Sequence, residues 1–188
     1  MVLEGRVVRL EPLRDHHLDG LCLAGLDSSI WTWMPAPVTD RAGMSVWIQE
    51  ALAAQVAGTQ LPYAIIERAT GRIAGSTRFM AIEPAHRRLE IGWTWLGAAW
   101  QRTAVNTEAK HLLLTHAFES LGMHRVEFKT DALNARSRAA LLRIGAIEEG
   151  TLRSHMITAS GRVRDSVYFS VLAAEWPAVK AGLSTRIS

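Results

Sequence analysis

The sequence predicts an α+β fold in which a mixed, mostly antiparallel sheet is flanked by helices. Strand-like alternation and helix-like periodicity follow each other in the order β-α-α-β-β-β-α-β-α-β-β, which is not the regular βαβ repeat of a parallel sheet. The 188 residues, 48% of them hydrophobic, can build one core but not two comfortable ones. Because no repeat, low-complexity tract or linker interrupts the chain, we expect one domain over residues 1–188.

The elements of the N-terminal half follow from alternation, composition and turn residues. The turn ATG at residues 69–71 joins two alternating segments into a hairpin, and Gly58 is a stop signal for a helix. The stretch IWTWMPAP places two tryptophans among prolines, which is typical of a loop whose rings pack on the core or line a cleft. The predicted elements are a strand at 3–10, a short helix from about 12 to 23, a loop at 27–40, a helix at 43–57 and strands at 61–67 and 72–82.

The second half begins with the alternating strand 89–96. One predicted face carries Leu89, Ile91, Trp93 and Trp95, and the other carries Glu90, Gly92, Thr94 and Leu96. A helix with an apolar stripe follows, and its stripe comprises Leu114, Ala117, Phe118 and Leu121, with Gly122 placed to end it. The remaining predictions are a strand at 125–131, a helix at 135–144 capped by Asn134 and ended by Gly145, strands at 146–157 and 162–171, and a brief tail from 175.

Residues 88–121 form a strand, a short irregular loop and a helix N-terminus, which together predict an anion site. The first turn of a helix offers backbone N–H groups without intrahelical partners and a partial positive charge. We therefore expect a phosphate to bind across residues 101–107.

Composition limits the remaining classes of function. A net charge of +3 lacks the dense basic clustering of a nucleic-acid surface, and no apolar run approaches membrane-spanning length. A single cysteine, Cys22, fits a reducing interior, and no signal-peptide pattern opens the chain, so we expect a cytoplasmic protein. His111 and His116 stand five residues apart rather than the four of a helical metal pair, and no metal is expected.

Three stretches, LEIGWTWL, QRTAVNTEA and VEFKTDALNARSRAALLRIGA, together with the element order, resemble the GNAT superfamily of acyl-CoA-dependent N-acyltransferases, and its Rim-type branch of ribosomal-protein N-acetyltransferases in particular. The resemblance spans nearly the whole chain. The family's phosphate loop follows the pattern Gln/Arg-x-x-Gly-x-Gly/Ala, where this chain has Ala104 and Asn106. Since Ala adds only a methyl group and Asn tolerates left-handed conformations, we expect the loop to bind phosphate, with weaker or shifted contacts.

The resemblance implies direct transfer of an acetyl or related acyl group from acyl-CoA to a primary amine. Glu90 or His155, or a water, would act as base, and Ser137 or a water as proton donor. A backbone N–H near Trp93 to Trp95 would stabilise the oxyanion. The implied cofactor contacts are Trp93, Thr94, Trp95, Gln101, Arg102, Thr103, Ala104, Val105, Asn106, Thr107, Asn134, Ser137 and Arg138, with Arg136 and Arg143 as alternatives for the 3′-phosphate. Trp31, Trp33 and Tyr168 are expected to contact the acceptor.

Each role has a structural alternative. Glu90 would otherwise be a solvent-facing residue paired with Arg87 or Arg88, and His155 a hydrogen-bonded sheet residue. Asn134 and Ser137 would cap the helix beside them, and the four tryptophans named would be packing residues, Trp93 and Trp95 on the face covered by the long helix. A non-catalytic acyl-CoA-binding module and a cofactor-free structural protein are the other classes considered. Peptide N-termini, aminoglycosides, amino acids and polyamines remain open as acceptors, and an edge at 162–171 suggests a homodimer.

Overall fold

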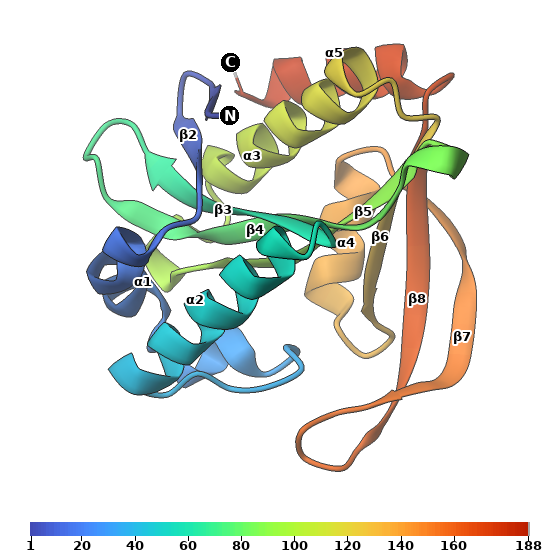
Figure 1. The fold of residues 1–188 in the computed structure, drawn as a ribbon. Coiled ribbons are helices and arrows are strands. Elements are labelled where there is room, and N and C mark those ends of the chain that lie inside the picture. The colour runs from blue at the N-terminus through green and yellow to red at the C-terminus, as the bar shows by residue number, and fades with distance from the viewer. Residues whose placement is uncertain (188) are drawn as a thin grey trace.

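The computed structural model describes residues 1–187, which form an eight-stranded sheet flanked by five α-helices (Figure 1). The strand order is β1-β2-β3-β4-β5-β6-β8-β7, and only β5 and β6 run parallel, so the predicted α+β class with a mostly antiparallel sheet is confirmed. The strands are β1 (Leu3–Glu4), β2 (Val8–Pro12), β3 (Gln60–Glu67), β4 (Ile73–Glu83), β5 (Arg88–Leu96), β6 (Arg125–Asp131), β7 (Ile147–Ile157) and β8 (Val163–Leu172).

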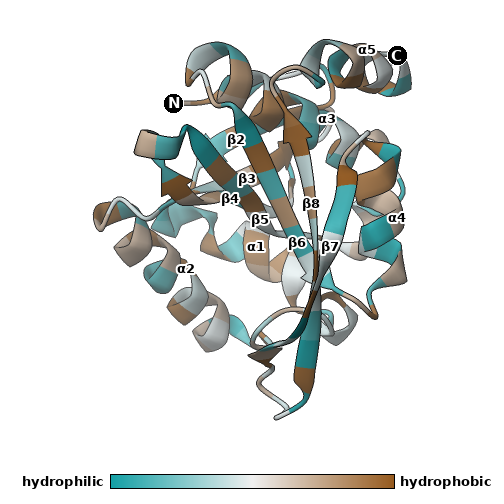
Figure 2. Ribbon diagram, turned by 90° about the vertical axis from the view of Figure 1, so that its right-hand side faces the viewer, coloured by the Kyte–Doolittle hydropathy of each residue, from teal (hydrophilic) through white to brown (hydrophobic). Residues whose placement is uncertain are grey.

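The helices cover both sides of the sheet. In Figure 1, α1 (Leu18–Gly25) and α2 (Arg41–Val56) lie below it, while α3 (Ala104–Thr115) and α5 (Trp176–Ile187) lie above it, and α4 (Ala135–Arg143) packs beside β6 and β7. Hydrophobic and hydrophilic residues are interspersed along the strands, as Figure 2 shows, because successive side chains point to opposite faces. Within residues 1–187 no helix is both long and apolar enough to cross a membrane.

The predicted first strand is in fact two short strands joined by a tight turn. The buried Glu108 carboxylate of α3 accepts hydrogen bonds from the backbone N–H groups of Arg6, Val7 and Val8, at 2.6 to 2.8 Å. These bonds take donors that an unbroken strand would give to its neighbour. The strand is therefore broken by contacts to Glu108, which is about a hundred residues away in the sequence. The local alternation of residues cannot reveal such a contact.

The helix after β5 also departs from the prediction. Its regular part ends at Thr115, and residues His116–Ser120 form a π turn in which the Leu121 N–H donates to the carbonyl of His116. The wider turn shifts the register of the side chains. Leu121, predicted on the buried stripe, is therefore 41% exposed, while Leu114 and Ala117 are buried as expected.

The tail from residue 175 is not brief, because it forms the twelve-residue helix α5. Trp176 and Leu183 bury its inner face against α3, and the Trp176 indole N–H donates to Glu119 at 2.7 Å. The hairpin near residues 162–171 does offer an edge of the sheet, as predicted, but through its other strand. Strand β8 is paired on both sides, and β7 forms the edge of the sheet.

Candidate active site

The main cavity lies where β5 and β6 separate. The two strands pair only at Arg88 with Arg125, Leu89 with Val126 and Glu90 with Glu127, and beyond that point they diverge. The gap opens into a cavity of about 590 Å³. Its walls are the later residues of β5 and β6, the loop and first turns of α3, one side of α4, Ile30 with Trp33 to Pro35, Gln60 and Met80, and Met156 and Arg164 of the last two strands.

A β-bulge in β5 sets the orientation of the side chains at this cavity. On β4 and β5, Ser76 pairs with Trp95, and Arg78 pairs with Gly92. Two residues of β5, Trp93 and Thr94, therefore lie opposite the single residue Thr77 of β4. Trp93 has a positive φ of 50°. The extra residue reverses the alternation beyond Gly92. The predicted faces of β5 are therefore correct up to Gly92 and wrong after it.

The contacts of β5 show the reversal directly. Glu90 and Gly92 share one face, since a Cβ on Gly92 would meet the Glu90 carboxylate at 3.0 Å. Trp95 packs on that same side, against Trp31 and against Trp47 of α2. Thr94 instead points toward α3, where it accepts a hydrogen bond from Lys110.

The loop before α3 is held without the family's glycines. Thr103 is the N-cap, with its hydroxyl accepting from the Val105 N–H, and Arg102 adopts a left-handed φ of 63°. Ala104 and Asn106 already belong to the helix and have negative φ, so neither position requires glycine for its backbone conformation. The presence of Ala104 and Asn106 in place of glycine therefore affects only how closely a ligand can approach the backbone at these positions.

Helix α4 closes the other side of the cavity. The Asn134 side chain accepts from the Ser137 N–H at 3.0 Å, as the predicted cap requires, and both residues line the cavity. Arg136 also lines it and donates to the Gln101 side chain at 2.8 Å, while Gln101 donates to the Leu96 carbonyl. These bonds tie α4 and β5 to the loop that precedes α3.

Glu90 is a buried carboxylate in the cavity wall, with 5% of the residue exposed. Burial raises the pKa of its carboxyl, while the Lys129 ammonium, whose Nζ lies 3.5 Å from Oε2, opposes that rise. Arg88 pairs with Glu127 rather than with Glu90. The alternative of a solvent-facing Glu90 paired with a neighbouring arginine is therefore wrong.

Lys110 and Lys129 are cavity residues that the sequence reasoning missed. Lys110 is 5% exposed, donates to the Thr94 hydroxyl at 2.7 Å and lies 5.6 Å from the centre of the Phe128 ring. Burial lowers the pKa of its ammonium to about 7, against a smaller opposing effect of Glu90. A signal was available, since Lys110 precedes Leu113 and Leu114 by three and four residues and so lies on the buried stripe of its helix.

Charged residues continue along the β6 side of the cavity. Asp131 is buried, accepts from the Leu133 N–H and forms an ion pair with Arg162, while Arg164 Nε lies 3.9 Å from the same carboxylate. Arg162 also stands over the Trp33 ring. This network fixes the last two strands against the loop that contains Trp33.

Most of the predicted site residues meet at this cavity. Those that line it are Glu90, Trp93, Thr94, Trp95, Gln101, Arg102, Thr103, Asn106, Thr107, Asn134, Ser137 and Trp33. Those outside its lining are Ala104, Val105, Arg138, His155, Tyr168 and Trp31. Predicted site residues from four separate segments of the chain therefore line one cavity.

The residues outside the lining have structural explanations. Val105 points into the core, and Arg138 is bonded to Glu148 and to the Ala132 carbonyl. His155 lies edge-on to Tyr168, 5.8 Å between ring centres, and burial together with nearby cations lowers the pKa of its imidazole. Trp31 is 3% exposed and its indole N–H donates to the Gly25 carbonyl, so it is a packing residue.

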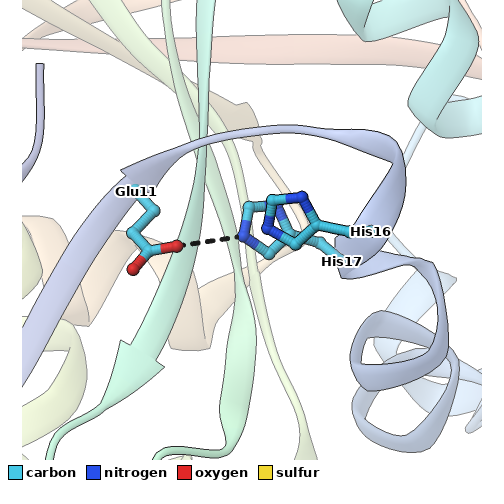
Figure 3. A group of neighbouring side chains, drawn as sticks. All are labelled: Glu11, His16 and His17. Carbon is cyan, nitrogen blue, oxygen red and sulfur yellow. Dashed lines mark hydrogen bonds and ion pairs between the residues drawn. The ribbon is translucent and has the colours of Figure 1, made fainter.

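Glu11, His16 and His17 form a separate group at the start of the first helical segment (Figure 3). The His17 Nδ1 accepts from the Arg14 N–H at 3.0 Å, which leaves Nε2 protonated to donate to Glu11 at 3.2 Å. Both ring nitrogens are therefore used within the chain. The group explains a local turn and needs no ligand.

The comparisons with known proteins agree with this architecture. The family described as acetyltransferase (GNAT) domain matches residues 8–147. The chain belongs to the GNAT acetyltransferases. Its predicted resemblance to this family is confirmed.

Three bacterial proteins illustrate what this GNAT acetyltransferase is similar to. It is 34% identical over 110 residues to YdaF of Bacillus subtilis, whose name assigns it provisionally to ribosomal N-acetylation, and the match covers 58% of this chain and 59% of YdaF. It is 30% identical over 159 residues to the uncharacterised N-acetyltransferase p20 of Bacillus licheniformis, covering 84% and 88% of the two chains. A GCN5-related N-acetyltransferase from Brucella melitensis has a TM-score of 0.94 and 36% identity, over 100% of this chain and 86% of that one.

Proposed function

We propose that the protein transfers an acetyl or closely related acyl group from acyl-CoA to a primary amine by direct attack of the amine on the thioester. The observation that carries the proposal is the position of Glu90. It is a buried carboxylate at the point where β5 and β6 separate, next to a bulge in the strand, and it faces the same cavity as the α3 N-terminus. A base and an anion site in one cavity are what such a transfer requires.

The acyl-CoA would bind along the α3 and α4 side of the cavity. Its phosphates fit the loop and first turn at residues 101–107, where helix N–H groups and Arg102 provide positive charge. Arg136 and Arg143 line the same region and fit the 3′-phosphate better than Arg138, which is already bonded to Glu148. Asn134 and Ser137, which line the cavity on the α4 side, would contact the pantetheine arm.

The thioester would lie at the β5 bulge. A bulge leaves backbone groups without ladder partners, so an N–H near Trp93 can donate to the oxygen of the attacked carbonyl. Glu90 is on the face toward α2 and accepts the proton of the amine, directly or through a water. Because its burial raises the pKa of the carboxyl, Glu90 is a stronger base than an exposed carboxylate.

The acceptor would enter from the face toward α2, between Trp33, Met34 and Pro35 on one side and Met80 on the other. Those residues form a largely apolar entrance that suits a peptide N-terminus, and one relative is named for ribosomal N-acetylation. An α-amine, with a pKa of roughly 7.7–8, is also easier to neutralise than a lysine amine at roughly 10.4. We therefore favour a protein N-terminus among the possible acceptors.

Two measurements test the proposal. Acetyl-CoA should raise the melting temperature by mass action, and thiol release from acetyl-CoA should depend on added peptides with free N-termini but not on N-acetylated versions of them. Glu90→Gln should still bind acetyl-CoA yet release thiol about a hundredfold more slowly. Binding without thiol release for any amine would reject catalysis in favour of a non-catalytic acyl-CoA-binding module. No binding at all would reject the use of acyl-CoA.

A further inference from the structure

The proposed reaction leaves the buried Lys110 without a role. Lys110 lies in the cavity wall, and among residues 1–187 its ammonium has no carboxylate within ion-pair distance. Its hydrogen bond goes to the Thr94 hydroxyl, which also bonds the Thr77 hydroxyl at 2.8 Å. Burying an ammonium without a counter-charge costs free energy, so its retention in the cavity wall needs an explanation.

We propose that Lys110 donates the proton to the coenzyme A sulfur as the thioester bond breaks. The amine nitrogen forms the new C–N bond, the C–S bond breaks with its electron pair on sulfur, and a proton moves from Lys110 Nζ to that sulfur. The amine loses its own proton to Glu90 or water, and Lys110 is reprotonated from solvent as the products leave. The inference rests on the proposed acyl transfer and assigns its second proton transfer.

Geometry supports this role. Lys110 lies on α3 two turns beyond Thr103, on the side of the sheet where the acyl-CoA would enter. Its Nζ is hydrogen-bonded to Thr94, which directly follows the bulge residue Trp93. A thiolate formed there would supply the negative charge that the buried ammonium otherwise lacks. The two tyrosines of the sequence, Tyr63 and Tyr168, lie outside the cavity lining, so neither can donate this proton there, and the Lys110 ammonium is a stronger acid than the Ser137 hydroxyl that also lines the cavity.

The acid–base properties of Lys110 agree with the geometry. The pKa of its ammonium is lowered to about 7 by burial, which brings it near that of a thiol, roughly 8.5. A donor and acceptor of similar pKa exchange a proton readily in either direction. The charged or polar groups that act on Lys110 are Glu90 and Thr94 of β5, and the Phe128 ring of β6 faces it from the other strand.

The first experiment measures the titration of Lys110 itself. The chain has three lysines, Lys110, Lys129 and Lys180, so ¹³Cε-labelled lysine gives three signals that single Lys→Met variants assign. With acetyl-CoA bound, the Lys110 signal should titrate near the pH at which kcat of the wild type falls on its alkaline side. A separation of more than about one unit between the two values would overturn the inference.

The second experiment compares variants, with a short peptide that carries a free N-terminus as the acceptor and with thiol release measured in a Cys22→Ala background. Lys110→Met should lower kcat about a hundredfold or more, change the KM for acetyl-CoA less than about threefold, and abolish the alkaline fall. Lys110→Arg keeps the positive charge but does not give up a proton, so it should remain within about threefold of the rate of Lys110→Met; recovery to near the wild-type rate would overturn the proton transfer. Lys180→Met, an exposed lysine paired with Glu119, is the matched control and should behave as the wild type.

The outcomes separate the two hypotheses. A folded Lys110→Met variant that keeps kcat within about threefold of the wild type, or keeps its alkaline fall, overturns the role of Lys110 and leaves acyl transfer intact. A wild type that releases thiol no faster than the uncatalysed reaction with any peptide or other amine overturns acyl transfer and this role with it. If Lys110→Met does not fold, the titration of wild-type Lys110 decides the question.

Discussion

The burial of Lys110 predicts a stability that depends on pH in a defined window. In the folded protein the pKa of its ammonium is lowered to about 7, whereas in the unfolded chain it is about 10.5. The unfolded chain therefore binds more protons between these values, and the free energy of unfolding rises with pH across the window. At about 1.4 kcal/mol per pKa unit, the charged Lys110 costs the folded state about 5 kcal/mol below pH 7.

Lys110→Met removes this cost, so the variant should be more stable than the wild type at pH 7. The stability advantage of the variant should shrink by about 2 kcal/mol between pH 7 and pH 9, as the folded wild type loses its proton while the unfolded wild type keeps it. Urea unfolding of both proteins at pH 7, 8 and 9 measures the difference, and effects of groups present in both cancel.

Lys180→Met serves as the control, and its difference from the wild type should not change with pH because Lys180 is exposed. A difference between Lys110→Met and the wild type that stays constant within about 0.5 kcal/mol from pH 7 to 9 would refute the reasoning. It would mean that Lys110 is not desolvated in the way its contacts indicate.

Three further predictions concern the cavity. Burial raises the pKa of the Glu90 carboxyl, so kcat/KM should rise with pH through that raised value, and Glu90→Gln should lose this rise along with about a hundredfold in rate. Arg136→Ala should weaken coenzyme A binding about tenfold in calorimetry, and should weaken the binding of dephospho-coenzyme A less. The control Arg138→Ala should change the binding of neither ligand. Equal losses of affinity for both ligands in Arg136→Ala would exclude a contact to the 3′-phosphate. Trp31→Ala should cost about 3–5 kcal/mol in urea unfolding, whereas Trp33→Ala should leave stability nearly unchanged and raise the KM of a peptide acceptor; a stable Trp31→Ala variant would contradict its core position.

The parts of the fold that sequence predicts well are those with local causes. Strand β6 lies at the predicted residues, and Asn134 caps α4, because alternation and capping depend on neighbours along the chain. The break before Val8 depends on Glu108, about a hundred residues away, and no local pattern encodes it. Helix α5 was missed although Trp176 and Leu183 lie seven residues apart, on one face of a helix.

The same distinction holds for the site. The strand, loop and helix that predicted an anion site could be read from one continuous stretch, and its residues line the cavity. The burial of Glu90 could not be read in this way, because it depends on where β5 and β6 separate and on Lys129 across the gap. The sequence identified Glu90 as a candidate, but the alternative that it pairs with Arg87 or Arg88 was wrong, because its ion-pair partner is Lys129.

The bulge at Trp93 explains how the two groups proposed to transfer protons, Glu90 and Lys110, can lie on opposite sides of β5. In a regular strand, Thr94 would share the face of Glu90 and Gly92, and Trp95 would point toward α3. Lys110 would then lose its hydrogen-bond partner. One inserted residue therefore directs Thr94 toward α3 while Glu90 stays toward α2. In the proposed reaction, a thioester between β5 and β6 would meet the proposed base Glu90 on the acceptor side and the Lys110 ammonium on the thiol side. The positive φ of Trp93 is the strained conformation through which β5 achieves this arrangement.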